Sequence, residues 1–584
     1  MVIISVTDFI FGGHIEREID YMKRIIATGK QSFEKIISSN CFYVDKTFFI
    51  KEWWESEDDV TLITRPRRFG KTLTMEMLEC FFSNEYKNRG DLFEGLFIWE
   101  EEKYRKLQGT YPVISLSFAN VKEEDCETAI YRTCQLLKKQ YEKYRFLTEG
   151  NLLSDAEKLY FEKMAASMDK LDAPMALYQL SDYLCRYYGK KIIILLDEYD
   201  TPMLEAYQKG YWEELVSFMR GLFNSTFKTN PYMERSIMTG ITRVSKKSIF
   251  SDLNNLEVVT VTSYKYAKAF GFTEEEVFMA LDEYGLLEEK EEVKKWYDGF
   301  IFGGYADIYN PWSILNFLSK KKYMAYWANT SSNELVGRLI RRAGGGIKKN
   351  FEDLINGKMI CCSIDEQLIY NQLDRSESAI WSLLVASGYL KIVSYEKRTE
   401  FGLGRKAKYE LAITNGEVID MFSEMVSGWF SEAEDSYNDF IKAMFLNDLD
   451  AMNVYMNRVS MQTFSSFDTG RNPSESEPER FYHGFVLGLM ADLSVEYIIT
   501  SNRESGFGRY DVMIEPRDQS KKAVIMEFKV HNPRREASLE ETVQAAHKQI
   551  QEKQYEEVLL DKGFGREQIY KYGFAFEGKK VLIG

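Results

Sequence analysis

The sequence predicts an α/β protein of several domains, with a parallel sheet in its amino-terminal half. Ile192–Leu196 is an unbroken aliphatic run, which is typical of a strand buried on both faces of a parallel sheet. Val60–Thr64 is a second short apolar strand, followed by a turn and a helix with apolar residues at helical spacing. Two more strands, Tyr510–Glu515 and Ala523–Val530, flank a polar turn and predict a hairpin in a separate carboxy-terminal α/β domain.

Length and composition set the outer limits. A chain of 584 residues should hold about three or four domains, and 45% hydrophobic content supports packed cores. The net charge of −15 argues against nonspecific coating of nucleic acid but leaves a local basic groove open. The seven cysteines include no CxxC pair, and the four histidines are scattered, which argues against a zinc site. With no membrane span and no signal peptide in the sequence, we expect a cytoplasmic protein without a membrane partner.

The turn after Val60–Thr64 ends in Gly70-Lys71-Thr72, where the helix begins. This is the layout of a phosphate-binding loop, because the free amides at a helix start hold phosphate oxygens. Lys71 would add charge near the β- and γ-phosphates, and the Thr72 hydroxyl would ligate Mg²⁺. Arg65 stands where the motif has its first glycine. The alternative is a basic turn that caps a helix.

Asp197 and Glu198 follow the Ile192–Leu196 strand. Carboxylates at the carboxyl end of such a strand lie in the crevice where α/β sheets bind ligands. Asp197 would hold Mg²⁺ and Glu198 would polarise an attacking water. The alternative is an ordinary acidic loop, but Gly70-Lys71-Thr72 upstream favours an ATP site.

The next predicted strand, Arg235–Thr239, also ends in polar residues. Thr239, Thr242 and Arg243 are candidates for sensing the γ-phosphate. Arg243 could offset charge in the transition state. The alternative is a surface arginine that pairs with nearby acids.

Between these motifs and the carboxy-terminal hairpin, the pattern is largely helical. The order helix, strand, loop, strand over Ser376–Ile413 predicts a winged-helix-like unit. Its loop carries a short basic tip, Phe401–Lys406, which could bind DNA. A packing or lid role is the simpler interpretation.

The carboxy-terminal hairpin carries the second chemical cluster. Strand alternation places Glu527 and Lys529 on one face, with Asp511 opposite them at the start of the partner strand. Two carboxylates can bind Mg²⁺, and a lysine can orient or deprotonate a water that attacks a phosphodiester. Glu479 could supply a third carboxylate, and Gln549 could reach the same site. The alternative is a strand face with alternating charges.

Arg65–Thr72 (RPRRFGKT) resembles the phosphate loop of the AAA-ATPase-like family of P-loop NTPases. Tyr43–Thr47 (YVDKT), Asp197–Pro202 (DEYDTP) and Ser251–Leu256 (SDLNNL) resemble it too, and the likeness covers roughly residues 33 to 310. That family shares the arginine in place of the first glycine. The resemblance implies ATP binding and hydrolysis with Mg²⁺. The implied nucleotide-binding residues are Arg67, Arg68, Phe69, Gly70, Lys71, Thr72 and Asp197.

Residues 479–579 resemble the PD-(D/E)xK nuclease superfamily, in the branch fused to AAA-ATPase-like domains. The matching stretches are Ser501–Asp511, Glu527–Lys529, Gln549-Ile550 with Lys553 and Tyr555, and Gly573–Lys579. The resemblance implies a restriction-endonuclease-like fold with Asp511 and Glu527 as metal ligands and with Glu479, Lys529 and Gln549 in catalysis. Members of this superfamily can also bind without cutting.

We therefore predict four regions: an extension without motif (1–27), an AAA-ATPase-like domain (28–310), a helical and winged-helix-like linker (311–460) and a nuclease-like domain (461–584). The expected protein is bacterial, uses ATP and Mg²⁺, and acts on nucleic acid, with DNA favoured over RNA. Its ATP state would gate the nuclease site, and family likeness suggests defence or mobile-element biology. The alternative is an ATP-dependent switch or scaffold that binds without cleaving. A homo-oligomer is left open.

Overall fold

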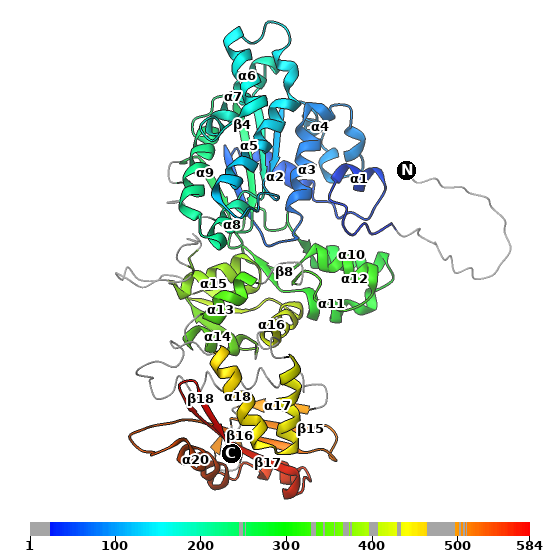
Figure 1. The fold of residues 1–584 in the computed structure, drawn as a ribbon. Helices are drawn as coiled ribbons and strands as arrows, with labels where there is room; N and C mark the ends of the chain where they lie inside the picture. The colour runs from blue at the N-terminus through cyan, green and yellow to red at the C-terminus, as the bar shows by residue number, and fades with distance from the viewer. Residues whose placement is uncertain are drawn as a thin grey trace, which may run out of the picture.

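The protein is described by a computed structural model (Figure 1). The structure describes residues 24–243, 249–250, 253–328, 334–342, 345–355, 357–365, 373, 376–395, 407–428, 434–463, 497–501, 504–505, 508–509 and 511–584. The molecule is elongated, with the parallel-sheet part, the middle part and the carboxy-terminal part following one another along its length (Figure 1). Most of the predicted extension, residues 1–23, lies outside the described residues. The first described residue, Arg24, forms an ion pair with Glu283 at 2.6 Å.

The amino-terminal domain is built on a five-stranded sheet in the order β2-β3-β4-β1-β5. All neighbouring pairs are parallel, so the strands end at one edge. The central strands are buried because their residues are apolar on both faces. The strands are β1 Val60–Thr64, β2 Val113–Ser117, β3 Ile192–Asp197, β4 Met233–Gly240 and β5 Leu256–Val259.

Helices cover this sheet, and some of them begin at side-chain caps. Asp125 caps α5, and Ser154 with Glu157 forms a capping box at α6. Three helices, α5–α7, form a helical insertion between β2 and β3. The helices are α1 Phe33–Ser38, α2 Phe48–Glu55, α3 Lys71–Phe82, α4 Glu102–Arg105, α5 Cys126–Lys143, α6 Asp155–Ser167, α7 Ala173–Tyr188, α8 Thr201–Lys209 and α9 Trp212–Phe227.

The middle part contains the predicted helix–strand–strand order as α15, β10 and β11, joined by the unpredicted strand β9. The tip at 401–406 lies outside the described residues. A second small sheet, β6-β8-β7, contains a hairpin that the sequence did not reveal. The elements are β6 Phe272–Thr273, α10 Glu274–Glu283, α11 Lys290–Tyr297, β7 Phe300–Phe302, β8 Tyr305–Tyr309, α12 Pro311–Lys320, α13 Glu334–Arg342, α14 Gly345–Ile355, β9 Ile360–Cys362, α15 Glu377–Ala386, β10 Leu390–Tyr395, β11 Tyr409–Ile413 and α16 Gly416–Gly428.

The carboxy-terminal part is a five-stranded mixed sheet in the order β12-β15-β16-β17-β18. The predicted hairpin is β15–β16, and β16 runs parallel to β17 with α20 in the connection. The elements are α17 Glu434–Leu446, α18 Leu449–Thr463, β12 Tyr497–Ser501, β13 Glu504–Ser505, β14 Gly508–Arg509, β15 Val512–Pro516, β16 Ala523–Val530, α20 Leu539–Glu552, α21 Glu557–Asp561, β17 Ile569–Glu577 and β18 Lys580–Ile583.

The hydrophobic cores do not follow the predicted domain limits at 310 and 460. One core joins the amino-terminal sheet to the middle part, and it includes Trp327, Trp381 and Phe422. A separate core joins α17 and α18 to the carboxy-terminal sheet, with Met444 and Met456 against strand residues. We therefore place α17 and α18 with the carboxy-terminal domain. Among the described residues, no helix combines the length and apolar character needed to cross a bilayer.

Glu417, at the start of α16, is a fully buried carboxylate in the middle part. It accepts hydrogen bonds from Ser313 Oγ at 2.9 Å and from the Trp327 amide. Burial raises the pKa of Glu417 from 4.5 to about 7. Because the folded-state pKa lies above the unfolded value, this group stabilises the fold fully below pH 4.5 and loses that contribution as the pH rises to about 7.

We predict that Glu417→Gln removes the loss of stability that Glu417 causes as the pH rises. The difference in melting temperature between variant and wild type should become more positive from pH 5 to pH 8. The corresponding change in the free energy of unfolding has an upper limit on the order of 3 kcal/mol. Thermal unfolding across that range measures it, and the same change at the exposed Glu377 controls for losing a carboxyl group. A difference that is flat with pH would contradict the prediction.

Candidate nucleotide and nuclease sites

The loop between β1 and α3 has the backbone of a phosphate-binding turn. Gly70 has φ of 80°, and a Cβ added there would meet nothing within 4 Å, so its conformation rather than crowding favours glycine. Arg68 also lies in the left-handed region, with φ of 66°. The helix that begins at Lys71 leaves its first amides facing this turn, which makes an anion site.

Lys71 folds back over the loop. Its Nζ donates to Arg65 O at 2.9 Å and to Pro66 O at 2.8 Å, and the residue is only 7% exposed. Burial lowers the pKa of Lys71, while Asp197 acts in the opposite direction. A phosphate group would give this ammonium a stronger acceptor than the two carbonyls.

Asp197, the last residue of β3, joins the second half of the site to the first. Its Oδ2 accepts from Thr72 Oγ1 at 2.7 Å, and its Oδ1 accepts from Thr239 Oγ1 at 2.5 Å. The contact arises because β3, β4 and β1 are parallel neighbours and end at the same edge. A hydroxyl and a carboxylate at this separation are oxygen ligands of the kind that Mg²⁺ prefers.

The two carboxylates that follow Asp197 in the sequence, Glu198 and Asp200, have different environments. Glu198 has φ of 52°, a conformation that costs energy in a residue with a side chain, and its Oε2 accepts from Thr201 Oγ1 at 3.1 Å. Asp200 is buried, and its Oδ2 accepts from the Thr242 amide and hydroxyl, both at 2.8 Å. Burial raises the pKa of Asp200. Asp200 therefore fixes the turn after β4, while Glu198 stays partly exposed.

Arg65 replaces the first glycine without entering the loop's cavity. Its guanidinium is buried below the loop and donates to Thr64 O at 2.9 Å, Thr260 O at 2.8 Å and Tyr266 O at 3.4 Å. It also lies 4.8 Å from the centre of the Phe302 ring. Burial lowers the pKa of Arg65 to about 9. The arginine therefore ties the loop to the residues after β5.

The second cluster lies where β15 begins and β16 ends. Lys529 Nζ donates to Glu527 Oε1 at 3.2 Å, and Gln549 Nε2, from α20, donates to the same oxygen. Asp511 Oδ2 accepts from the Phe528 amide at 2.8 Å, next to Glu527 in the strand register. Glu527 is 1% exposed. Burial raises the pKa of Asp511. Glu479 lies outside the described residues.

Comparison with known families identifies both regions. Residues 27–250 match a family model described as a predicted AAA-ATPase, and residues 477–584 match one described as the PD-(D/E)XK nuclease superfamily. The chain carries a predicted AAA-ATPase domain and a PD-(D/E)XK nuclease superfamily domain. It is also 26% identical over 403 residues, covering 68% of both chains, to an uncharacterized protein in the vnfD 5′ region of Azotobacter chroococcum mcd 1.

The AAA-ATPase domain places its other predicted residues in different surroundings. Arg67 lines a cleft together with Asp200 and Thr242. Arg68 Cζ lies 4.5 Å from the centre of the Trp312 ring. Phe69 is 1% exposed, and its ring packs against Phe300.

Arg243 lies apart from the cleft that Arg67 lines. It lines a second pocket with Thr64, Thr260 and Ser382 from α15. A role for Arg243 at the γ-phosphate therefore stays a prediction. The pocket is nevertheless shared between the AAA-ATPase domain and the winged-helix-like unit.

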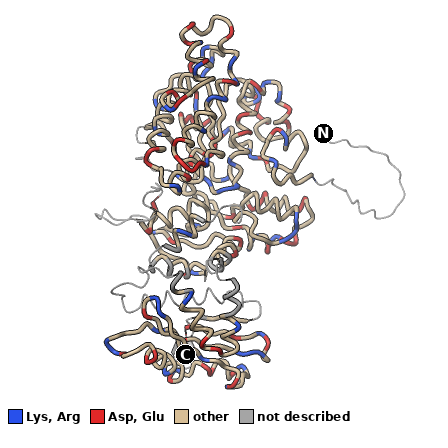
Figure 2. The backbone as a smooth tube through the Cα atoms, viewed as in Figure 1, with Lys and Arg blue, Asp and Glu red and all other residues tan. Residues whose placement is uncertain are grey.

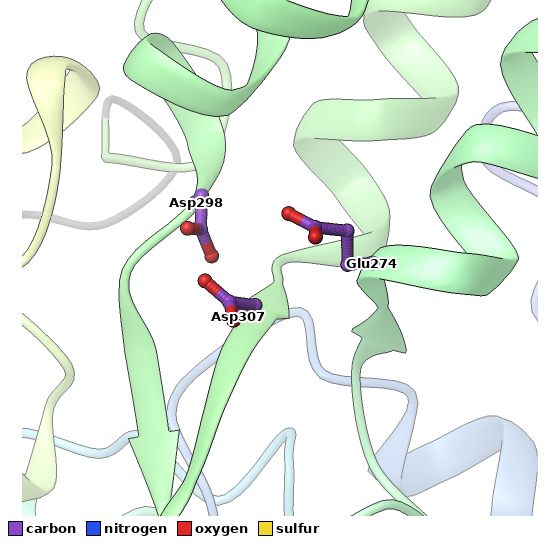
Figure 3. A group of neighbouring side chains, drawn as sticks. All are labelled: Glu274, Asp298 and Asp307. Carbon is purple, nitrogen blue, oxygen red and sulfur yellow. The ribbon is translucent and has the colours of Figure 1, made fainter.

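An acidic group that sequence reasoning missed lies between α10, α11 and β8 (Figure 3). Glu274, Asp298 and Asp307 have ligand oxygens within 4.8 Å of one another. Lys294 Nζ lies 3.2 Å from Asp307 and also contacts Glu274, so the ammonium group of Lys294 already balances part of the negative charge. Burial raises the pKa of Asp298 to about 7. The three carboxylates of this cluster are 9 to 33 residues apart in sequence, so no local pattern in the sequence reveals the cluster.

Charge is mixed over the whole described chain. Basic and acidic segments are interspersed in the AAA-ATPase domain, the middle part and the nuclease domain (Figure 2). That nucleic acid is not coated nonspecifically stays a prediction from the net charge of −15.

Proposed function

We propose that this chain binds and hydrolyses ATP with Mg²⁺ at the loop between β1 and α3, and cleaves nucleic acid at the Asp511–Glu527 cluster. The substrate of first choice is DNA, and the expected setting is the cytoplasm. A defence or mobile-element role stays a prediction from family likeness.

The observation that carries the nucleotide part is the 2.7 Å hydrogen bond from Thr72 to Asp197. It pairs the hydroxyl that follows Lys71 with the carboxylate that ends β3, so both halves of a Mg²⁺–phosphate site face each other. Mg²⁺, when bound, would neutralise phosphate charge. Lys71 would exchange its carbonyl acceptors for phosphate oxygens, and Glu198 would orient the water.

The nuclease part is supported by the hydrogen bonds that join Glu527 to Lys529 and Gln549. Asp511 and Glu527 offer carboxylate oxygens, which fit a hard divalent cation that keeps some of its own water. Lys529 would hold or deprotonate the attacking water, and Gln549 would fix the Glu527 carboxylate. The ATP state would act on this site through the middle part.

The test uses full-length protein with ATP, Mg²⁺ or Mn²⁺, and a panel of DNA and RNA. We predict that Asp511→Asn lowers cleavage by at least about 100-fold, because a neutral amide is a poor ligand for a hard cation. ATP turnover should not change, because the two sites are in separate domains.

The matched control is Asp518→Asn, in the exposed turn of the same hairpin, where Asp518 Oδ1 accepts from the Ser520 amide. It should cleave like the wild type. Wild-type protein that cuts no nucleic acid with any divalent metal would reject the nuclease part and leave the ATP-dependent switch or scaffold.

A further inference from the structure

The phosphate-binding loop is held by a segment that follows the matched AAA-ATPase region in sequence. Phe69 lies against Phe300 of β7, with ring centroids 4.7 Å apart, and Arg68 lies over Trp312. Arg65 lies over Phe302. Residues 300–312 lie beyond the matched residues 27–250. The loop that would hold the phosphates therefore takes part of its support from this segment.

The β7–β8 hairpin in this segment is itself anchored to the sheet. The Gly303 amide donates to Val261 O at 3.0 Å, just after β5. Gly303 has φ of 54°, and a Cβ there would lie 2.2 Å from Ser263 O, so a larger residue would push the hairpin away. The hairpin thus joins the β5 end of the sheet to the phosphate loop.

Asn310 links this segment to the loop through its side chain, which hydrogen-bonds to one backbone group on each side. Its Nδ2 donates to Arg67 O at 3.2 Å, and its Oδ1 accepts from the Trp312 amide at 2.9 Å. The side chain is fully buried. An amide side chain suits both tasks, because it carries a donor and an acceptor on one carbon. It caps α12 and holds the loop at the same time.

The bond to Arg67 O controls the direction of the next amide. In a trans peptide, the carbonyl of Arg67 and the N–H of Arg68 point in opposite directions. Fixing that carbonyl toward Asn310 turns the Arg68 amide away from Asn310, toward the other side of the loop. It also supports the left-handed backbone of Arg68, a conformation that is strained in a residue with a side chain.

We propose that Asn310 is a positioning residue of the nucleotide site, and that ATP binding and the placement of residues 300–312 are coupled through it. This inference rests on the proposed ATP site. If ATP binds only when the loop has this conformation, ATP binding stabilises the contacts of residues 300–312 with the loop. By linkage, those contacts strengthen ATP binding by the same factor.

The test variant is Asn310→Ser in the full chain. Serine still caps α12 through its hydroxyl, but it is too short to reach Arg67 O. The matched control is Asn316→Ser on the same helix, because Asn316 is buried and its Nδ2 donates to Trp312 O at 2.8 Å and not to a carbonyl of the loop. ATP affinity and melting temperature are measured for both variants without nucleic acid.

We expect Asn310→Ser to weaken ATP binding about tenfold, the equivalent of one hydrogen bond. Asn316→Ser should lower the melting temperature to a similar extent with unchanged affinity. Hydrogen exchange supplies the second readout: ATP should protect the amides of 300–309 in the wild type and protect them less in Asn310→Ser.

Equal ATP affinity of the wild type and Asn310→Ser, with equal protection of 300–309, would overturn this inference and leave the ATPase proposal standing. Equal losses of affinity in both asparagine variants would also overturn it, since a general weakening of α12 would explain them. Wild-type protein that binds no ATP would overturn the proposed function together with the inference.

Discussion

Lys71→Met is expected to abolish ATP turnover and to leave the nucleotide-free protein as stable as the wild type, or more stable. The Lys71 ammonium is 7% exposed and donates to two backbone carbonyls. Burial lowers the pKa of Lys71, which means that the folded protein holds this charge at a cost in free energy. Methionine of similar length removes the charge and keeps the packing.

Two measurements separate the functional and structural effects. The rate of phosphate release should fall by at least about 100-fold, the size of losses when a preorganised charge is removed from an active site. ATP at a hundred times the Kd should stabilise the wild type by about 2.7 kcal/mol and so raise its melting temperature. It should not raise the melting temperature of Lys71→Met.

Lys46→Met is the matched control, because Lys46 is similarly buried and burial lowers its pKa too, but Glu276 opposes that shift as a direct ion-pair partner. Lys46 Nζ donates to both oxygens of Glu276, at 2.8 and 2.7 Å. Losing it leaves that carboxylate without its cation, which costs about 3 kcal/mol for a buried pair. Lys46→Met should therefore lower the melting temperature, unlike Lys71→Met. Equal losses in the two variants would show that the carbonyl bonds of Lys71 stabilise the fold.

Short-range pattern was enough to predict that the loop after β1 and the acid that ends β3 lie together, as the two halves of the proposed nucleotide site. The sequence around Thr72 shows a strand, a turn and a helix start, and the sequence before Asp197 shows a buried strand that ends in an acid. Parallel strands in one sheet end at one edge, so their contact follows from the fold class alone. In the nuclease domain, strand alternation likewise predicted that Glu527 and Lys529 share a face.

The supports of these sites could not be predicted in the same way. Asn310 contacts a loop more than 240 residues earlier in the chain, and β7 is a strand of 3 residues. The side chain of Arg65 could have pointed into the loop or below it, and only the tertiary contacts at Thr260 and Tyr266 decide between them. Such contacts leave no periodic signal in the sequence.

The predicted domain limit at 460 lies inside α18, whose contacts with the carboxy-terminal sheet also leave no periodic signal. Asn453 and Asn457 on α18 look like an ordinary polar helix face, yet they bind the edge strand β18. Asn453 Nδ2 donates to Ile583 O at 2.8 Å, and the Ile583 amide donates to Asn453 Oδ1 at 2.7 Å. Asn457 binds Val581 O and the Val581 amide in the same way, at 2.6 and 3.0 Å.

The spacing explains why this arrangement fits. Two residues four apart on a helix are separated by about 6 Å along its axis, and two residues two apart on a strand are separated by about 6.6 Å. Asparagines at 453 and 457 therefore match alternate residues of β18, and each supplies a donor and an acceptor to the free edge. The helix closes the edge of the sheet, as a further strand would.

Asn453→Ala with Asn457→Ala should therefore destabilise the carboxy-terminal domain by about 4 kcal/mol, at about 1 kcal/mol for each lost hydrogen bond. It should also cause self-association, because an uncovered edge strand can pair with another copy. Thermal unfolding and size-exclusion chromatography of the full chain measure both effects. Val454→Ala, at a position 69% exposed on the same helix, is the control and should change neither.

The same contacts predict which fragment folds. A chain that begins at 434 keeps α17 and α18 and should unfold in one cooperative transition, whereas one that begins at 477, where the nuclease family match starts, exposes β18 and should associate. A well-behaved monomer from 477–584 would show that the asparagines are not needed to cover the edge. The domain would then begin where the family match begins, and α17 and α18 would return to the linker.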